Sequence, residues 1–201
     1  MRNLLGLTAV LLLIFAIPAA ALALEQNEEI EIGRGAVVEL RQYGFTSEAP
    51  LQTIGQALSQ VVERKDLPWH FWVLEESEQL NAFALPGGFV FITRRYYEML
   101  NADELAFVVG HEMAHIDKHH FEDKMRSARR AQFYDILADI LITATKADKG
   151  WRTVADAGTA AYYSKYSRKL EREADLWGYR YTYNAGFDAQ QAVTALGKLG
   201  E

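Results

Sequence analysis

The segment that most constrains the fold runs from Asn101 to about Met125 and is apolar on nearly every side when drawn as a helix. Asn101 followed by Glu104 has the form of a capping box, in which each side chain bonds the backbone amide of the other residue, so a helix is expected to begin there. A helix without a polar face is not suited to the surface. We therefore predict that this helix is central and buried, and that other elements pack around it.

Four of the chain's five histidines lie in this helix, in the sequence GHEMAHIDKHH that ends at His120. His111 and His115 are four residues apart and share one face, where both rings can reach a single ion about 2.0–2.1 Å from each nitrogen. His119 is eight residues from His111, about 12 Å along the helix axis, and His120 is expected to point to the opposite side. The spacing therefore predicts that His111 and His115, and neither of the other two, bind one metal ion.

Glu112 lies between these two histidines, about 100° round the helix from His111. There it flanks a metal without binding it, as a base acting on metal-bound water requires, and H-E-x-x-H combines zinc as Lewis acid with Glu as general base. The alternative is that two core histidines bond to backbone carbonyls and hold no metal. A carboxylate on so apolar a helix is costly to bury unless it is paired or functional, which favours the metal site.

A catalytic zinc needs three protein ligands and one open position. A third histidine six residues after His115, with glycine between, is excluded because position 121 is Phe and position 118 is Lys. The third ligand must therefore come from another helix. The segment YSRKLEREADLWGYRY, residues 166–181, offers three carboxylates: Glu171, Glu173 and Asp175.

Helix geometry separates these three carboxylates. Glu171 and Asp175 share a face with Ala174 and Gly178, whose small size would let this helix approach the histidine helix closely. Glu173 lies on another side. We predict Glu171 as the third ligand, and Asp175 as the acceptor of the second ring N–H of a ligating histidine, fixing its tautomer. The alternative is an ordinary acidic surface helix.

The remaining segments predict two helices and a small sheet. Helices are expected across Gly33–Tyr43 and Leu51–Arg64, where apolar residues recur at helical spacing. The runs WHFWVLEE (69–76) and FVFIT (89–93) are aromatic and β-branched, and a Pro-Gly-Gly turn precedes the second, so a sheet of two or three strands is expected. The order helices, sheet, helices predicts a mainly helical α+β fold.

Composition fits one domain and excludes several functions. The chain has 201 residues, of which 50% are hydrophobic and 24% charged, enough to bury one core. A formal net charge of -6 without a basic stripe argues against nucleic acid as a partner. The chain has no cysteine, which excludes disulfides, thiolate zinc sites and a cysteine nucleophile.

The first 23 residues have the pattern of a signal peptide. Arg2 precedes an apolar core, Leu4–Ile17, and small residues then occupy the positions expected before a cleavage site. We predict cleavage after Ala23, with Ala21 as the near alternative, and a single domain over residues 24–201. The apolar run is shorter than the roughly 20 residues that span a bilayer. Export to the periplasm or cell envelope is therefore favoured over an uncleaved membrane anchor.

Three stretches together resemble the HtpX and CAAX-prenyl-protease family of zinc metallopeptidases, metallopeptidase family forty-eight. They are NAFALPGGFVFITRRYYEML, ADELAFVVGHEMAHIDKHH and SRKLEREADLWGYRYTYNAGFDAQ, in this order. The resemblance covers about Glu28 to Leu199 and is closest to soluble bacterial members of the cell envelope. It implies a zincin-like (gluzincin) fold with a small mixed sheet. It also implies one Zn²⁺ per chain, bound by His111, His115 and Glu171. The implied general base is Glu112, and the implied acid that supports a ligating histidine is Asp175.

The resemblance further implies how a polypeptide substrate binds. The strand near residues 81–85 would be an exposed sheet edge beside the cleft, where an extended chain adds through main-chain hydrogen bonds. The candidate substrate-binding residues are Asn81, Ala82, Phe83 and Ala84. The implied function is a metalloendopeptidase that cleaves extended or misfolded polypeptides in the cell envelope, in association with envelope proteins or the membrane.

Several points stay open at this level. Arg180, Tyr181 and Tyr183 are equal candidates for a second donor to the oxyanion. Residues 131–150 predict an amphipathic helix, for which packing on the core is favoured over membrane contact, and a lid over the cleft is a further alternative. Neither the multiple membrane spans nor the repeat-containing C-terminal extension of some relatives is expected. The oligomeric state is undetermined. A functional alternative is a zinc-stabilised, chaperone-like module that binds unfolded proteins on its edge strand without cleaving them.

Overall fold

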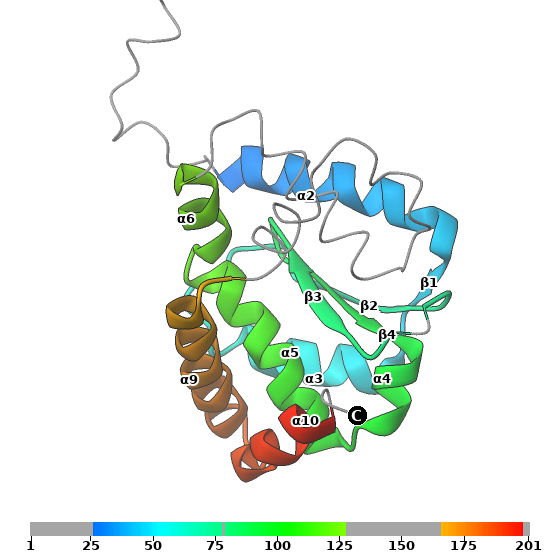
Figure 1. Ribbon diagram of the computed structural model, residues 1–201, viewed down its shortest axis with the longest axis vertical. Helices are drawn as coiled ribbons and strands as arrows, with labels where there is room; N and C mark the ends of the chain where they lie inside the picture. Colours follow the sequence, from blue (N-terminus) through cyan, green and yellow to red (C-terminus); the bar gives the residue numbers. More distant parts are fainter. Residues whose placement is uncertain (1–25, 78, 128–165, 199–201) are drawn as a thin grey trace, which may run out of the picture.

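The computed structural model describes residues 26–77, 79–127 and 166–198 (Figure 1). The predicted signal peptide and the segment 131–150 lie outside the described residues. The described elements are, in chain order, α2 (Gln26–Leu40), the 3-10 turn η2 (Arg41–Tyr43), β1 (Phe45–Thr46), α3 (Ala49–Ser59), β2 (His70–Leu74), β3 (Ala82–Leu85), β4 (Phe89–Thr93), α4 (Arg94–Met99), α5 (Ala102–Asp117), α6 (His120–Ser127), α9 (Arg168–Asn184), the 3-10 turn η5 (Ala189–Gln191) and α10 (Ala192–Lys198). The fold is mostly helical with a small mixed sheet, so the α+β prediction is confirmed at this level.

The sheet has four strands in the order β1-β2-β4-β3. β2 and β4 are parallel, with His70 opposite Phe89, and the outer strands β1 and β3 are antiparallel to their neighbours. Every residue of β4 is buried, which explains why the first four residues of its sequence, FVFIT, are all apolar. The expected strands within 69–76 and 89–93 are confirmed. The expected total of two or three strands is wrong, because β1, only two residues long, carries too weak a pattern to predict.

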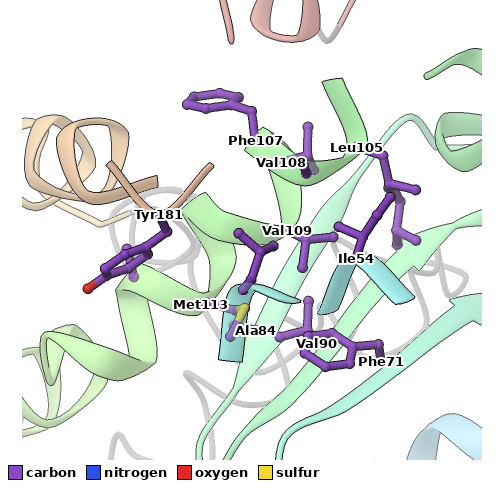
Figure 2. Close-up of a cluster of buried hydrophobic side chains, with 14 of the residues drawn as sticks. Ile54, Phe71, Ala84, Val90, Leu105, Phe107, Val108, Val109, Met113 and Tyr181 are labelled. Atoms are coloured by element: carbon purple, nitrogen blue, oxygen red, sulfur yellow. The ribbon is translucent and has the colours of Figure 1, made fainter. Parts of the chain in front are cut away.

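Helices cover both faces of the sheet, with α2 on one face and α3 and α5 on the other (Figure 1). Figure 2 shows the larger core, in which Val109 and Met113 of α5 meet Phe71 and Val90 of the sheet. On the opposite face, Leu40 of α2 joins an aromatic group from the strands. The prediction of a central, buried helix is confirmed for α5, from Leu105 onward.

Helix α5 begins as predicted but ends early. The side chain of Asn101 accepts bonds from the backbone N–H groups of Asp103 and Glu104, and the Glu104 carboxylate accepts a bond from the backbone N–H of Asn101, which completes the capping box. The expected continuation to about Met125 is wrong, because α5 ends at Asp117 and α6 starts anew at His120. His119 between them has φ of 57°, a left-handed backbone that turns the chain.

The end of α5 is fixed by partners that are distant in sequence. The buried carboxylate of Asp117 accepts bonds from the backbone N–H of Arg64 and from the hydroxyl of Tyr181 on α9. The guanidinium of Arg64 donates to the carbonyl of Ile116 at 3.1 Å. The second helix, α3, ends at Ser59, so the prediction that it reaches Arg64 is wrong, and Arg64 instead contacts the end of α5.

Helix α2 also differs from the predicted helix over Gly33–Tyr43. It begins earlier, at Gln26, and ends at Leu40, and residues Arg41–Tyr43 form the 3-10 turn η2. The acidic start of α2 looks like a solvated segment in the sequence. In the structure Glu29 is only 2% exposed, forms an ion pair with Arg64, and accepts a bond from the N–H of Gly87 at 3.0 Å. This carboxylate therefore attaches α2 to the turn before β4.

Helices α5 and α9 cross at two glycines. A Cβ built on Gly178 would lie 2.8 Å from the backbone nitrogen of His111 and 2.9 Å from its Cα, and one on Gly110 would lie 3.1 Å from the carbonyl oxygen of Gly178. Ala174, one turn earlier on α9, is fully buried. The prediction that small residues allow α9 to approach the histidine helix closely is confirmed.

Within the part of the chain that is described, no helix is both long and apolar enough to cross a lipid bilayer.

The glycine crossing gives a first prediction. Gly178→Ala should push α9 away from α5, because the atoms it meets are backbone of His111, and overpacking of this kind costs about 1–3 kcal/mol. Thermal unfolding of the purified variant should begin at a lower temperature than in the wild type. Gly35→Ala on α2 is the control, since nothing lies within 4 Å of the added Cβ, and it should gain up to about 1 kcal/mol from helix propensity. Equal destabilisation by both variants would contradict the close crossing.

Arg94, the first residue of α4, joins three segments of the chain. Its guanidinium donates to Glu75 after β2, at 2.6 and 3.0 Å, and to Glu48 before α3, at 2.7 Å. Hydrogen bonds from Arg94, and then from Thr46, lower the pKa of Glu75 below its usual range.

This lowered pKa predicts a pH dependence. The stabilisation is fully present above the ordinary pKa of Glu75, near 4.5, and is lost as the pH falls through the lowered value in the folded state. Arg94→Gln should therefore lower the free energy of unfolding at pH 7 by about 0.2–1 kcal/mol, and the difference from the wild type should shrink as the pH falls below about 4.5. Arg34→Gln, which removes an exposed pair with Glu31, should have a smaller effect. If Arg94→Gln stays equally less stable than the wild type in acid, the ion pair with Glu75 is not the cause of its lower stability.

Candidate metal centre

Helices α5 and α9 bring three donor groups together. His111 and His115 lie on the last two turns of α5, and Glu171 lies in the first turn of α9, which the side chain of Ser167 caps through the N–H of Leu170. The Nε2 atoms of the two histidines are 3.1 Å apart, and Glu171 Oε2 lies 3.5 Å from that of His111 and 3.9 Å from that of His115. This is the grouping that the sequence predicts.

The three donors fit a zinc ion. Donor atoms at about 2.0–2.1 Å from a tetrahedral centre are about 3.3 Å from one another, and the observed separations of 3.1–3.9 Å bracket that value. Two imidazole nitrogens and one carboxylate oxygen are also a donor set that zinc accepts. The His115 side chain is 3% exposed and that of Glu171 is 40% exposed, so the group opens to solvent on the side of α9.

Asp175 lies behind His111, at the ring nitrogen opposite the donor group. Its Oδ1 is 3.0 Å from Nδ1 of His111. Burial alone would lower the pKa of His111, but Asp175 and Glu171, together with the charge of Glu112, raise it to about 10 in the metal-free site. A metal ion on Nε2 must displace a proton from this ring, while a proton on Nδ1 can stay and bond to Asp175.

Glu112 is held close to the donor group and to the sheet. Its pKa is raised to about 7, mainly by burial and further by the charge of Glu171. The charge of His111 and a hydrogen bond donated by the backbone N–H of Ala84 lower this pKa and oppose the rise. This bond joins the carboxyl of Glu112 to strand β3. The carboxyl therefore lies between the donor group and the edge of the sheet.

Strand β3 contains most of the predicted substrate-binding residues. It is an outer strand of the sheet, as expected, and Asn81 immediately precedes it. Ala84 packs in the core beneath α5, whereas Phe83 packs in the core beneath α2 and stacks on Phe91 at 5.3 Å. The side chains of Phe83 and Ala84 are thus buried, and what β3 offers a ligand is mainly its backbone.

Two aromatic residues near the donors were missed by the sequence analysis. Tyr166 stacks flat on His115, with ring centroids 4.0 Å apart and planes at 14°. His120, which was expected on the opposite side of the helix, instead has its Nδ1 3.0 Å from Nδ1 of His115. The prediction for His120 assumed an unbroken helix and is wrong, because α5 ends before it. His119 remains apart, with its Nδ1 2.6 Å from Glu122.

The three candidates for a second oxyanion donor lie farther along α9. The hydroxyl of Tyr181 is buried and donates to Asp117, the guanidinium of Arg180 packs over the ring of Trp177, and Tyr183 is 69% exposed. None of these contacts connects them to the donor group. The lid alternative for residues 131–150 lies outside the described residues.

Comparison with known proteins identifies the family to which this chain belongs. A family model described as Peptidase family M48 matches residues 46–200. This chain belongs to that family. The resemblance drawn from the sequence is therefore confirmed, and the chain carries a metalloprotease domain.

Relatives of the family include bacterial and mitochondrial proteases. The beta-barrel assembly-enhancing protease of Escherichia coli (strain K12) is 29% identical over 193 residues, which cover 90% of this chain and 39% of that protein. The mitochondrial metalloendopeptidase OMA1 of Schizosaccharomyces pombe is 30% identical over 130 residues, 64% of this chain and 37% of that protein. Metalloprotease YcaL of Escherichia coli (strain K12) is 25% identical over 178 residues, 87% of this chain and 66% of that protein. The chain thus spans about two fifths of the length of the first of these relatives.

The donor group predicts that zinc stabilises the fold. Zinc added to metal-free protein at one hundred times its dissociation constant should stabilise it by about 2.7 kcal/mol and raise the unfolding temperature accordingly. His111→Ala should abolish the zinc-dependent shift. His70→Gln, which changes the histidine on β2, should keep the shift at full size. A zinc response that survives His111→Ala would show that the ion binds elsewhere.

Proposed function

We propose that this chain is a zinc-dependent metalloendopeptidase that hydrolyses peptide bonds of extended or misfolded polypeptides in the cell envelope. The observation that carries the proposal is the convergence of His111, His115 and Glu171, whose donor atoms all lie within 4.8 Å of one another. Glu112 interacts electrostatically with His111 and Glu171 of this group. Membership in a family of peptidases supports the same chemistry. We take the fold to be of the gluzincin type, with α5 as its H-E-x-x-H helix.

Each residue of the site has a role in this proposal. Zinc held by His111, His115 and Glu171 would supply a Lewis acid that lowers the pKa of water toward 7 and polarises the substrate carbonyl. Glu112 is the general base: it takes a proton from the attacking water and returns it to the amine that leaves. Its raised pKa of about 7 in the metal-free site suits a carboxyl that must both accept and release a proton. Asp175 orients His111 through Nδ1.

The edge strand is the proposed binding site for substrate. An extended polypeptide added to β3 would bond to the backbone of residues 81–84, which gives affinity with little dependence on side-chain sequence. The bond between the Ala84 N–H and Glu112 supports this placement, since a chain lying along β3 would pass the base. We propose Asn81, Ala82, Phe83 and Ala84 as substrate-binding residues on this ground.

The proposed setting is the periplasm or cell envelope, with envelope proteins as substrates or partners in quality control. The predicted signal peptide over residues 1–23 supports export. A relative whose name refers to beta-barrel assembly supports an envelope role. The binding-only alternative, a zinc-stabilised module without cleavage, is not favoured, because Glu112 is present and the relatives are named as proteases.

A direct test follows zinc content and cleavage of unfolded casein by the full chain. Glu112→Gln should keep one zinc per chain and lose about 10²- to 10⁴-fold in turnover, because only the base is removed. Glu171→Ala should lose both zinc and cleavage. Glu28→Gln, at an exposed carboxylate of α2, is the matched control and should match the wild type in both measurements.

Two outcomes would overturn the proposal. Equal turnover by the wild type and Glu112→Gln would refute Glu112 as the base. Zinc-loaded wild type that binds unfolded casein tightly but leaves it intact would favour the binding module instead.

A further inference from the structure

His120, the first residue of α6, is buried against the back of one proposed zinc ligand. Its side chain is 1% exposed. Its Nδ1 lies 3.0 Å from Nδ1 of His115, and the two rings meet edge to face, with centroids 5.0 Å apart and planes at 74°. The contact is on the side of His115 opposite Nε2, the nitrogen that faces His111 and Glu171.

The chain reaches this position only because α5 is broken. In a continuous helix a residue five positions after His115 would lie about 140° away round the axis. The left-handed backbone of His119, an uncommon conformation for a residue other than glycine, ends that helix and redirects the next residue. Backbone of this kind tends to persist where the surrounding structure uses it. Here its effect is to bring the ring of His120 against that of His115.

The tautomers follow from the geometry. Two ring nitrogens 3.0 Å apart share one proton, so one of them donates and the other accepts. If His115 is to present a lone pair on Nε2 to a metal, its proton must be on Nδ1, and His120 must accept it on a bare Nδ1. The proton of neutral His120 is then on Nε2. The opposite arrangement would put a proton on Nε2 of His115, where it would block metal binding.

The far side of His120 faces a carboxylate that would hold this tautomer. Nε2 of His120 is buried and has no hydrogen-bond partner within the described part of the chain, and Glu173 Oε2 is 3.7 Å away. Glu173 is the acidic residue of α9 that faces neither His111 nor His115 at ion-pair distance. Its contact with His120 gives a role to Glu173, the acidic residue of α9 that has none in the proposed metal site.

We propose that His120 is a positioning residue for His115, accepting the Nδ1 proton of that ligand, and that Glu173 fixes the tautomer of His120 from behind. The two zinc-binding histidines would then be oriented in different ways, His111 directly by the carboxylate of Asp175 and His115 through an intervening imidazole. This inference rests on the proposed zinc site. It assigns to His120 and Glu173 roles in metal binding and none in contact with the substrate.

The first test measures zinc affinity of the full chain by competition with a chelator. His120→Leu keeps an apolar side chain of similar size but has no acceptor, and should weaken zinc binding about 10- to 100-fold. His120→Asn offers an oxygen near the position of Nδ1 and should stay within a few-fold of the wild type. The visible spectrum of the cobalt-substituted protein should change in His120→Leu and be largely restored in His120→Asn. A merely structural role would alter the unfolding temperature but not these two readouts.

The matched control is His119→Asn, because asparagine tolerates a left-handed backbone and the imidazole of His119 contacts Glu122 instead of the site. This variant should bind zinc like the wild type. Glu173→Gln should weaken zinc less than His120→Leu does. Zinc affinity of His120→Leu equal to that of the wild type would overturn the proposal.

A second measurement does not depend on any variant folding. Nitrogen NMR of the zinc-loaded wild type should show His115 protonated on Nδ1 and His120 protonated on Nε2. A proton on Nδ1 of His120 in the loaded protein would overturn the proposal even if zinc binds normally. Failure of the wild type to bind zinc at all is a different result, and it would instead remove the proposed function on which the inference rests.

Discussion

The contact between α5 and α9 at Gly110 and Gly178 is the constraint on which the site depends. Each helix alone carries only part of the candidate metal centre: two imidazoles on α5 and the carboxylates of α9. Because a Cβ at Gly178 would lie within 3 Å of the backbone of His111, no other residue allows this separation without moving one of the helices. The distances of 3.5 and 3.9 Å from Glu171 to the two histidines follow from that crossing.

Buried polar groups hold the two helices in register. Asp117 at the end of α5 receives the hydroxyl of Tyr181 from α9 and the backbone N–H of Arg64, and Arg64 in turn pairs with Glu29 of α2. Each of these groups is satisfied, so their burial specifies one arrangement of the helices. At the other end of α5, the capping carboxylate of Glu104 also accepts a bond from Lys198 of α10 at 2.7 Å. The helix that carries the histidines is therefore anchored at both ends.

Much of the fold and of the candidate site could be predicted from local patterns. The capping box at Asn101, the apolar girth of α5 and the small residues of α9 are each visible within a few residues of sequence, and the structure has all three. What escaped prediction depends on distant partners. The burial of Glu29 needs Arg64, and the break before His120 occurs at a histidine, with neither glycine nor proline to mark it. The contact of His120 with His115 was missed because this break was not foreseen, and the contact of Tyr166 with His115 because these two residues are far apart in the sequence.

The complete burial of β4 also has a consequence for the unfolded chain. Its sequence, FVFIT, has strong strand propensity and no charge, the kind of segment that pairs with copies of itself when it is exposed. Arg94 and Arg95 follow it immediately, and paired charges at the end of an apolar strand oppose stacking between molecules. In the folded protein Arg94 of α4 binds the carboxylates of Glu48, before α3, and Glu75, after β2. In the unfolded chain its charge would instead oppose aggregation through β4.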